Sequence, residues 1–350
     1  MMITNSDQIT HNKVDMFLDD KHGGDLSDAV RVNRKIKKWI DLSTGINPNA
    51  YNDFNIDKTV YSHLPCGNQL AELMSIARGY YNLNQEIKIC AYQGAQGVIN
   101  ILPNIVNKNI HDTIQILTPT YTEHYRVWND QGFKIRLVTN IENELDPSIP
   151  FVLVNPNNPD GKLFQPKYLE ELWERIRKAG GFLILDESFM DGTPDMSLRF
   201  DNCRDNVIVI RSFGKFFGLP GLRLGFVYGD NHYINKISSL VGPWPISSSS
   251  LLIARKAMLD TVWISTTITD LKMKSTALSN FLHDQKLKTV GDCYFFKTIE
   301  VDSASQMHKA LANHGIWTRI FNYNQKWLRM GLTKNKFEFE YLANTIMDIL

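Results

Sequence analysis

The chain contains few cysteines, no excess of charge of either sign and no long apolar segment. Its four cysteines are scattered over 350 residues without the paired spacing of a metal site, and so few do not build a disulfide framework in a chain of this length. The 38 basic and 37 acidic residues nearly cancel, which argues against a nucleic-acid-binding surface. No apolar run approaches the roughly 20 residues that a membrane helix needs. We therefore expect no nucleic-acid partner, no membrane partner and no bound metal.

The N-terminus is polar and lacks the apolar core of a secretory signal. Together with the few cysteines, which are typical of a reducing compartment, this predicts a soluble cytoplasmic protein. A chain of 350 residues is long enough to bury a large core and to divide into a larger and a smaller domain.

Short apolar runs alternate with longer amphipathic stretches through the middle of the chain. The runs lie at 87–90, 113–117, 151–154, 182–185, 207–210 and 224–228. Short runs rich in β-branched residues are typical of strands buried on both faces of a mostly parallel sheet. Residues 167–176 carry apolar side chains at helical spacing, which predicts a helix that crosses between strands. The sequence therefore predicts an α/β fold.

The pattern becomes helix-rich after residue 251, with one expected strand near 291–297. We expect a large domain over 46–250 and a smaller α+β domain over 251–350. The segment 1–45 is expected to join the smaller domain and to contribute to the active site.

The segment 211–225 (RSFGKFFGLPGLRLG) is the most informative part of the chain. Its one lysine, Lys215, follows the predicted strand 207–210, with Ser212 before it and Arg223 after it. A lysine amine in this position suits a Schiff base to an aldehyde cofactor, and the hydroxyl and guanidinium groups suit a phosphate on that cofactor. The Ser-x-x-Lys spacing alone would fit a basic surface loop equally well.

Polar signals also follow the other predicted strands, and ligands of open α/β sheets bind beyond the carboxyl ends of the strands. Residues 93–97 (QGAQG) open an apparent helix, whose first backbone amides are suited to a phosphate. Asp186 follows the run 182–185. A buried carboxylate requires a cationic partner, and a protonated pyridine nitrogen is one.

These elements, in this order, resemble the fold type I pyridoxal-phosphate (PLP) enzymes of the aspartate aminotransferase superfamily, over roughly residues 40–335. The resemblance implies an aspartate aminotransferase-like fold with pyridoxal 5′-phosphate as the cofactor. It implies that Lys215 bonds the cofactor and that Asp186, rather than Glu187, pairs with the ring nitrogen. Tyr121, in 118–125, would stack on the ring. Asn158, in the segment 155–161 (NPNNPDG), would contact the phenolic oxygen. The residues implied for the phosphate are Gly94, Ala95, Gln96, Ser212 and Arg223.

A narrower resemblance is to the threonine-phosphate decarboxylases of cobalamin biosynthesis. It is carried by the segments 22–24 (HGG), 41–48 (DLSTGINP), 242–244 (GPW) and 315–319 (GIWTR). It implies a small phosphorylated amino-acid substrate: decarboxylation of L-threonine O-3-phosphate to (R)-1-amino-2-propanol O-2-phosphate. Arg329 would grip the substrate carboxylate and Arg319 its phosphate, with Asn47 and His22 lining the pocket. Each arginine would otherwise be a solvated surface charge.

The superfamily also implies a homodimer with shared active sites. Tyr61 matches a tyrosine that reaches the partner's cofactor phosphate, although it would fit a core position as well.

Two other functions remain open. An aminotransferase of the histidinol-phosphate type differs only in which bond at Cα breaks. Such enzymes usually have tyrosine three residues after the ring aspartate, where this chain has Phe189, and this departure favours decarboxylation. A non-catalytic regulator on the same fold would need a DNA-binding domain, and the segment 1–45 shows no helix-turn-helix pattern.

Overall fold

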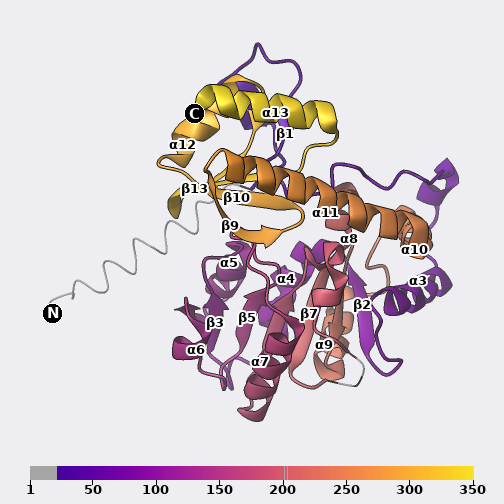
Figure 1. Ribbon diagram of the computed structural model, residues 1–350. Helices are drawn as coiled ribbons and strands as arrows, with labels where there is room; N and C mark the ends of the chain where they lie inside the picture. Colours follow the sequence, from indigo (N-terminus) through magenta and orange to yellow (C-terminus); the bar gives the residue numbers. More distant parts are fainter. Residues whose placement is uncertain (1–21, 201, 203) are drawn as a thin grey trace. The chain divides into compact units, whose positions relative to one another are not determined.

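The computed structural model describes residues 22–200, 202 and 204–350, which form two compact units (Figure 1). The sheet unit contains residues 49–158 and 163–271. The terminal unit contains 22–48, 159–162 and 272–350. The expected domain bounds were residues 45 and 250. The first observed boundary lies after residue 48, three residues later than expected. The second lies at 271, inside the long helix α11 (Thr261–Asp284), which continues from one unit into the other.

A seven-stranded sheet forms the centre of the sheet unit. Its spatial order is β2 (Lys88–Tyr92), β8 (Gly225–Gly229), β7 (Val207–Ser212), β6 (Leu183–Asp186), β5 (Phe151–Val154), β3 (Thr113–Leu117) and β4 (Lys134–Val138). Only β8 runs antiparallel to its neighbours. The prediction of a mostly parallel α/β sheet is confirmed.

The edge strand β4 was not predicted. Its sequence, KIRLV, alternates between exposed and more buried positions, because an edge strand keeps one side in contact with solvent. The prediction depended on continuous apolar runs, which mark strands buried on both faces.

Helices surround the sheet and follow its strands. They are α3 (Gly67–Tyr80), α4 (Gly94–Ile105), α5 (Glu123–Asp130), α6 (Ile141–Glu144), α7 (Pro166–Lys178), α8 (Phe213–Phe216), α9 (Asn231–Val241), α10 (Ser248–Leu259) and the start of α11. Short 3₁₀ turns are η1 (Lys58–Ser62), η2 (Met190–Gly192), η3 (Pro194–Met196) and η4 (Pro220–Leu222).

Helix α7 shows how the sequence dictates this packing. It begins at Pro166, whose fixed φ angle suits the first helical position. Its buried side chains, Leu169, Leu172, Trp173 and Ile176, belong to one cluster with apolar residues of β5, β6 and β7. Each such side chain contributes roughly 1.5–3 kcal/mol through its burial. The expected helix at 167–176 is therefore confirmed.

The register of the parallel strands brings the predicted functional positions to one edge. Val154 at the end of β5 pairs with Asp186, and Asp186 pairs with Ile210 of β7. Because β8 runs the opposite way, its first residue, Gly225, pairs with the last residue of β7, Ser212. The chain before β8 therefore returns to the carboxyl edge of the parallel strands.

The terminal unit is built on a four-stranded antiparallel sheet. Its order is β12 (Arg319–Phe321), β13 (Asn324–Gly331), β10 (Phe296–Glu300) and β9 (Lys288–Cys293). Helices α2 (Ser27–Val32), α12 (Ala304–Asn313) and α13 (Lys336–Ile349) complete the unit. The strand β1 (Ile40–Asp41) pairs in parallel with β11 (Ile316–Trp317). This pairing ties the N-terminal segment to the C-terminal part of the chain. The single strand expected near 291–297 is a hairpin of β9 and β10. No helix among the described residues is long and apolar enough to cross a bilayer.

Candidate cofactor and substrate sites

Asp186 is a buried carboxylate at the carboxyl edge of the sheet. Its Oδ2 atom lies 2.9 Å from Nε2 of His124, and its Oδ1 atom accepts the backbone N–H of Ser188 at 2.9 Å. Burial by itself raises the pKa of Asp186, but the hydrogen bonds from His124 and Ser188 outweigh it, so the pKa is lowered. The side chain is therefore held as an anion at the end of β6.

The neighbouring carboxylate, Glu187, is engaged elsewhere. It is fully buried and lies 3.2 Å from the guanidinium of Arg211. It also accepts the hydroxyl hydrogen of Ser197 at 2.6 Å. These contacts hold Glu187 in an internal ion-pair cluster, which leaves Asp186 as the carboxylate suited to a ligand.

His124 is a functional candidate that sequence reasoning missed. It lies in the first turn of α5, is completely buried and makes the contact with Asp186 described above. Its ring stands edge-on to the ring of Tyr121, with the centroids 6.2 Å apart. Its position three residues after Tyr121, in the first turn of the following helix, was the available signal. A lone helical histidine does not by itself indicate a partner 62 positions away in the sequence.

Tyr121 and Gln96, both expected at the cofactor, are directly bonded. The Tyr121 hydroxyl donates to Oε1 of Gln96 at 2.8 Å, and Nε2 of Gln96 donates to Glu123 at 2.8 Å. Burial and the nearby charge of Glu123 raise the pKa of Tyr121 well above its ordinary value, so the hydroxyl stays protonated. This series of hydrogen bonds fixes the orientation of the Tyr121 ring.

The start of α4 lies close to the Arg223 guanidinium and to Gly225. Gly94 has a φ of +78°, and a Cβ atom there would lie 3.0 Å from Nη2 of Arg223. A Cβ atom on Gly225 would lie 2.5 Å from the backbone nitrogen of Ala95. Glycine at both positions lets a guanidinium and two chain segments meet at a helix N-terminus. Free backbone amides and a cation together form an anion site.

Lys215 lies in the short helix α8, directly after Ser212 and β7. The flanking side chains of Phe213, Phe216 and Phe217 are fully buried and anchor the turn, whereas Lys215 is only partly buried. Its Nζ atom lies 5.2 Å from the centroid of the Phe189 ring. Because Phe189 is the third residue after Asp186, the lysine and the buried carboxylate are in one neighbourhood.

The loop that carries Asn158 is tied to the segment that carries Tyr121. Asn157 donates through Nδ2 to the carbonyl oxygen of Pro119 at 2.8 Å, and its Oδ1 accepts from Thr120 at 2.6 Å. Asn158 itself is partly buried beside this junction in the sequence. The expected cofactor residues of the sheet unit thus lie in connected loops at one edge. Tyr61 is the exception, since it lies in η1 and is 72% exposed.

The terminal unit holds the expected substrate residues. Arg319 of β12 and Arg329 of β13 stand directly opposite each other in the antiparallel pair, and both are more than 90% buried. Like charges in directly opposed positions destabilise a sheet. An anion bound between or beside the two guanidinium groups would offset this repulsion.

The N-terminal segment packs beside these arginines. Nη2 of Arg329 donates to the carbonyl oxygen of Ser43 at 2.7 Å, and the backbone N–H of Gly24 donates to Oγ of Ser43 at 2.9 Å. Gly23 lies so close to Ser43 that a Cβ atom would clash with its carbonyl oxygen. His22, next in the chain, is exposed, and Asn47 is buried. The unit therefore brings the segments of His22 and Asn47 to the strand of Arg329.

A titratable group that was not expected, His308 of α12, lies beside Arg319. Its Nδ1 atom is 2.9 Å from Oγ1 of Thr318, and its ring packs edge-on to Trp317. Burial and the charge of Arg319 lower the pKa of His308 to about 4. The neutral ring adds no positive charge beside Arg319.

We expect this depressed pKa to make stability depend on pH. The unfolded chain takes up the His308 proton near pH 6.5 and the folded chain only near pH 4. The neutral His308 ring therefore contributes to the free energy of unfolding above pH 6.5. This contribution, up to roughly 3 kcal/mol, is lost as the pH falls toward 4. His308→Asn keeps a hydrogen-bonding group but removes this titration. Urea unfolding should show wild type losing more stability than the variant over that range; parallel losses would contradict the assignment.

The chain is similar to a protein-family model and to several known proteins. The family model "aminotransferase class I and II" matches residues 36–346. A threonine-phosphate decarboxylase from Sinorhizobium sp. is 33% identical over 328 residues, which cover 93% of this chain and 97% of the relative. One from Pseudomonas aeruginosa is 32% identical, with coverage of 89% and 92%. A solved decarboxylase structure from Sulfurospirillum multivorans superimposes with a TM-score of 0.77 at 19% identity, covering 99% of both chains. The aspartate aminotransferase-like fold is therefore confirmed.

Proposed function

Because the chain belongs to the aminotransferase class I and II family, we propose that it is a PLP-dependent decarboxylase. Its substrate is L-threonine O-3-phosphate, and its product is (R)-1-amino-2-propanol O-2-phosphate, a precursor in cobalamin biosynthesis. The similarity to two threonine-phosphate decarboxylases extends over 89–93% of the chain and supports this reaction. The observation that carries the substrate class is the pair of buried arginines, Arg319 and Arg329, opposed on neighbouring strands.

The residues of the sheet unit fit pyridoxal 5′-phosphate. The N-terminus of α4, with the Arg223 guanidinium beside it, suits its phosphate, and the buried anion of Asp186 suits a protonated ring nitrogen. When bound, the cofactor supplies an electron sink for the charge that develops at the substrate Cα. Lys215 would hold it covalently, Tyr121 would stack on its ring and Asn158 would contact the phenolic oxygen. The phosphate would be held by Gly94, Ala95, Gln96, Ser212 and Arg223.

The substrate is held by its two anionic ends. We assign Arg329 to the α-carboxylate and Arg319 to the phosphate, with Asn47 and His22 beside them. Two fixed anchors determine the torsion about Cα and can therefore select which bond breaks. In decarboxylation the bond between Cα and the carboxylate carbon breaks, carbon dioxide leaves and its electron pair remains. One proton is then added at Cα, for which the Nζ atom of Lys215 is the assigned donor.

This reaction has an isotopic signature that separates it from transamination. In D₂O, decarboxylation keeps the original hydrogen at Cα and adds one deuteron, so the product carbon carries one of each. Transamination removes the original hydrogen. Proton NMR of the aminopropanol phosphate formed in D₂O should show a single deuteron on the amino-bearing carbon. Formation of a 2-oxo product, with no aminopropanol phosphate, would contradict the proposal.

Arg319→Ala should weaken the phosphorylated substrate selectively. A charge-assisted hydrogen-bonded contact contributes about 1.5–3 kcal/mol, so kcat/KM for L-threonine O-3-phosphate should fall roughly 10–100-fold. Trace turnover of unphosphorylated L-threonine should change far less. Lys326→Ala, an exposed basic residue on β13, is the control and should leave both substrates unaffected. An equal loss for both substrates in the Arg319 variant would mean that Arg319 does not bind the phosphate.

The enzyme is also proposed to act as a homodimer. Tyr61, which is 72% exposed, is assigned to the phosphate of the partner's cofactor. Sedimentation velocity of the PLP-loaded protein tests this directly, and a monomer at micromolar concentration would contradict it.

A further inference from the structure

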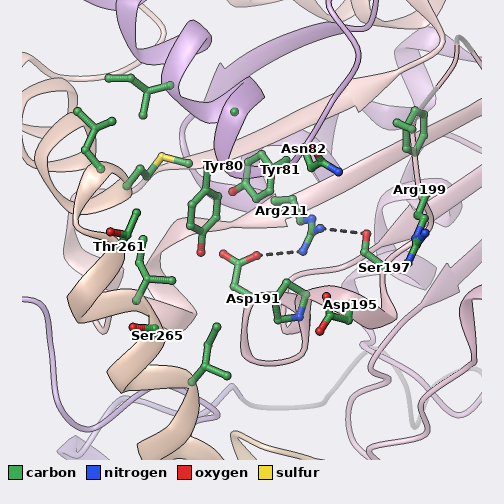
Figure 2. Close-up of a pocket in the computed structure, with 18 of the residues that line it drawn as sticks. Tyr80, Tyr81, Asn82, Asp191, Asp195, Ser197, Arg199, Arg211, Thr261 and Ser265 are labelled. Carbon is green, nitrogen blue, oxygen red and sulfur yellow. Dashed lines mark hydrogen bonds and ion pairs between the residues drawn. The ribbon is translucent and has the colours of Figure 1, made fainter.

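The sheet unit contains a cavity of about 910 Å³ that is separate from the candidate cofactor site (Figure 2). It lies between the end of α3, the turns η2 and η3, and the junction of α10 and α11. Arg211 of β7 forms part of its lining, and the next residue along the strand is Ser212, a proposed cofactor ligand. Successive side chains of a strand point to opposite faces. The side chain that lines the cavity and the side chain assigned to the cofactor therefore extend from opposite faces of β7.

The lining of the cavity is partly apolar and partly polar. The helices α10 and α11 provide Met258, Leu259, Ile264 and Ile268, together with the hydroxyl groups of Thr261 and Ser265. The opposite side holds the ion pair of Asp191 and Arg211 and the rings of Tyr80 and Tyr81, as Figure 2 shows. A ligand that fills such a space needs an apolar body and one polar end.

At the polar end of the cavity, Asp191 and a neighbouring carboxylate compete for one cation. The carboxylates of Glu187 and Asp191 share one guanidinium, that of Arg211, at 3.2 and 2.9 Å. The same guanidinium also donates to Ser197 at 3.0 Å and to the Tyr228 hydroxyl at 3.1 Å. Arg211 is 3% exposed and its nitrogens are all engaged, so it is not available to bind an anion.

Asp191 retains an unused acceptor. Its side chain is 5% exposed, Oδ1 is bonded to Arg211, and Oδ2 is buried with no donor in hydrogen-bonding geometry. Burial raises the pKa of Asp191 to about 6, although Arg211 and the Tyr80 hydroxyl oppose this rise. The Tyr80 hydroxyl does not satisfy Oδ2 in hydrogen-bonding geometry. The Tyr81 hydroxyl is likewise buried without a partner. Buried unsatisfied groups of this kind destabilise the folded protein.

We propose that this cavity binds an organic cation with an aromatic or otherwise apolar body. The ammonium N–H donates to the Asp191 carboxylate, whose Oδ2 atom has no donor in hydrogen-bonding geometry. The body packs between the Tyr80 ring and the apolar side chains of α10 and α11, and the face of Tyr80 adds cation–π attraction. This site is independent of the proposed decarboxylation, because it uses none of the residues assigned to that reaction.

The test uses a tertiary amine, because a primary amine would react with the cofactor aldehyde. The probe is N,N-dimethyl-2-phenylethylamine, protonated at neutral pH, titrated calorimetrically into the PLP-loaded protein. The matched neutral compound is 2-phenylethanol. A charge-assisted hydrogen bond should make the amine bind roughly 10–100-fold more tightly than the alcohol. Equal affinities, or stronger binding of the anion 3-phenylpropanoate, would overturn the proposal.

Two variants locate the binding. Asp191→Asn removes the charge while keeping the shape, so the amine should lose its advantage over the alcohol. Because Asp191 also anchors Arg211, a second variant leaves that cluster intact: Ser265→Trp, on the exposed side of α11, fills the cavity mouth. It should abolish binding of both compounds, whereas Thr266→Trp, exposed but outside the lining, should not. Amine binding that survives both Asp191→Asn and Ser265→Trp would place the cation elsewhere and refute the site.

Discussion

Lys215→Ala is expected to abolish covalent retention of the cofactor and to lower kcat by roughly 10⁴-fold or more, as the loss of a covalent catalytic group does. The reason is structural as well as chemical. Lys215 is the one lysine of the loop after β7, and its flanking phenylalanines are buried and hold the amine in place. The measurement is the visible absorbance of the PLP-loaded protein, before and after gel filtration, together with the turnover rate.

The control for this variant is Lys178→Ala, on the exposed surface at the end of α7. It should keep both the absorbance band and the activity. A Lys215→Ala protein that still retains the cofactor's visible band after gel filtration would remove Lys215 from its assigned role.

Asp186→Asn is expected to lower kcat by roughly 10²–10³-fold while the protein stays folded and the cofactor stays bound. The asparagine keeps the side-chain shape and can still accept the hydrogen bond from Ser188. It removes the buried negative charge that His124 orients, and loss of one preorganised electrostatic group at a reacting centre typically has this size. Steady-state kinetics with L-threonine O-3-phosphate, at saturating PLP, provide the measurement.

Glu187→Gln is the matched comparison, one residue away. Its carboxylate pairs with Arg211 and Ser197 inside the unit. The variant should therefore have a clearly lower melting temperature, whereas its kcat should fall less than that of Asp186→Asn. Breaking one partner of a buried ion pair typically costs 3–5 kcal/mol. A larger fall in kcat for Glu187→Gln than for Asp186→Asn would mean that the two carboxylates had been assigned the wrong way round.

Much of the sheet could be predicted because its strands are buried on both faces. The runs 113–117 and 151–154 coincide with β3 and β5, and the others differ from their strands by one or two residues at an end. The edge strand β4 was missed because half of its side chains face solvent. The hairpin of β9 and β10 was predicted as one strand, since a two-residue turn at Tyr294 interrupts the apolar pattern very little.

Site residues that a local sequence pattern marks could be predicted, whereas contacts between distant segments could not. Asp186, Ser212 and Lys215 could be proposed because each lies at or shortly after the end of a strand, and strand ends are readable in the sequence. The contact of His124 with Asp186 depends on how α5 packs against the sheet, which no local pattern records. The opposition of Arg319 and Arg329 depends on strand register, and a shift of one residue would have separated them.

The most direct test of the account is carbon dioxide release from L-threonine O-3-phosphate by the purified, PLP-loaded protein, with no 2-oxo acid present. We predict repeated turnover, with carbon dioxide and aminopropanol phosphate formed in equal amounts and the cofactor spectrum unchanged at the end. A single turnover that converts the cofactor to its amine form without carbon dioxide would contradict the account. It would identify an aminotransferase, of which the histidinol-phosphate type would be the first to assay.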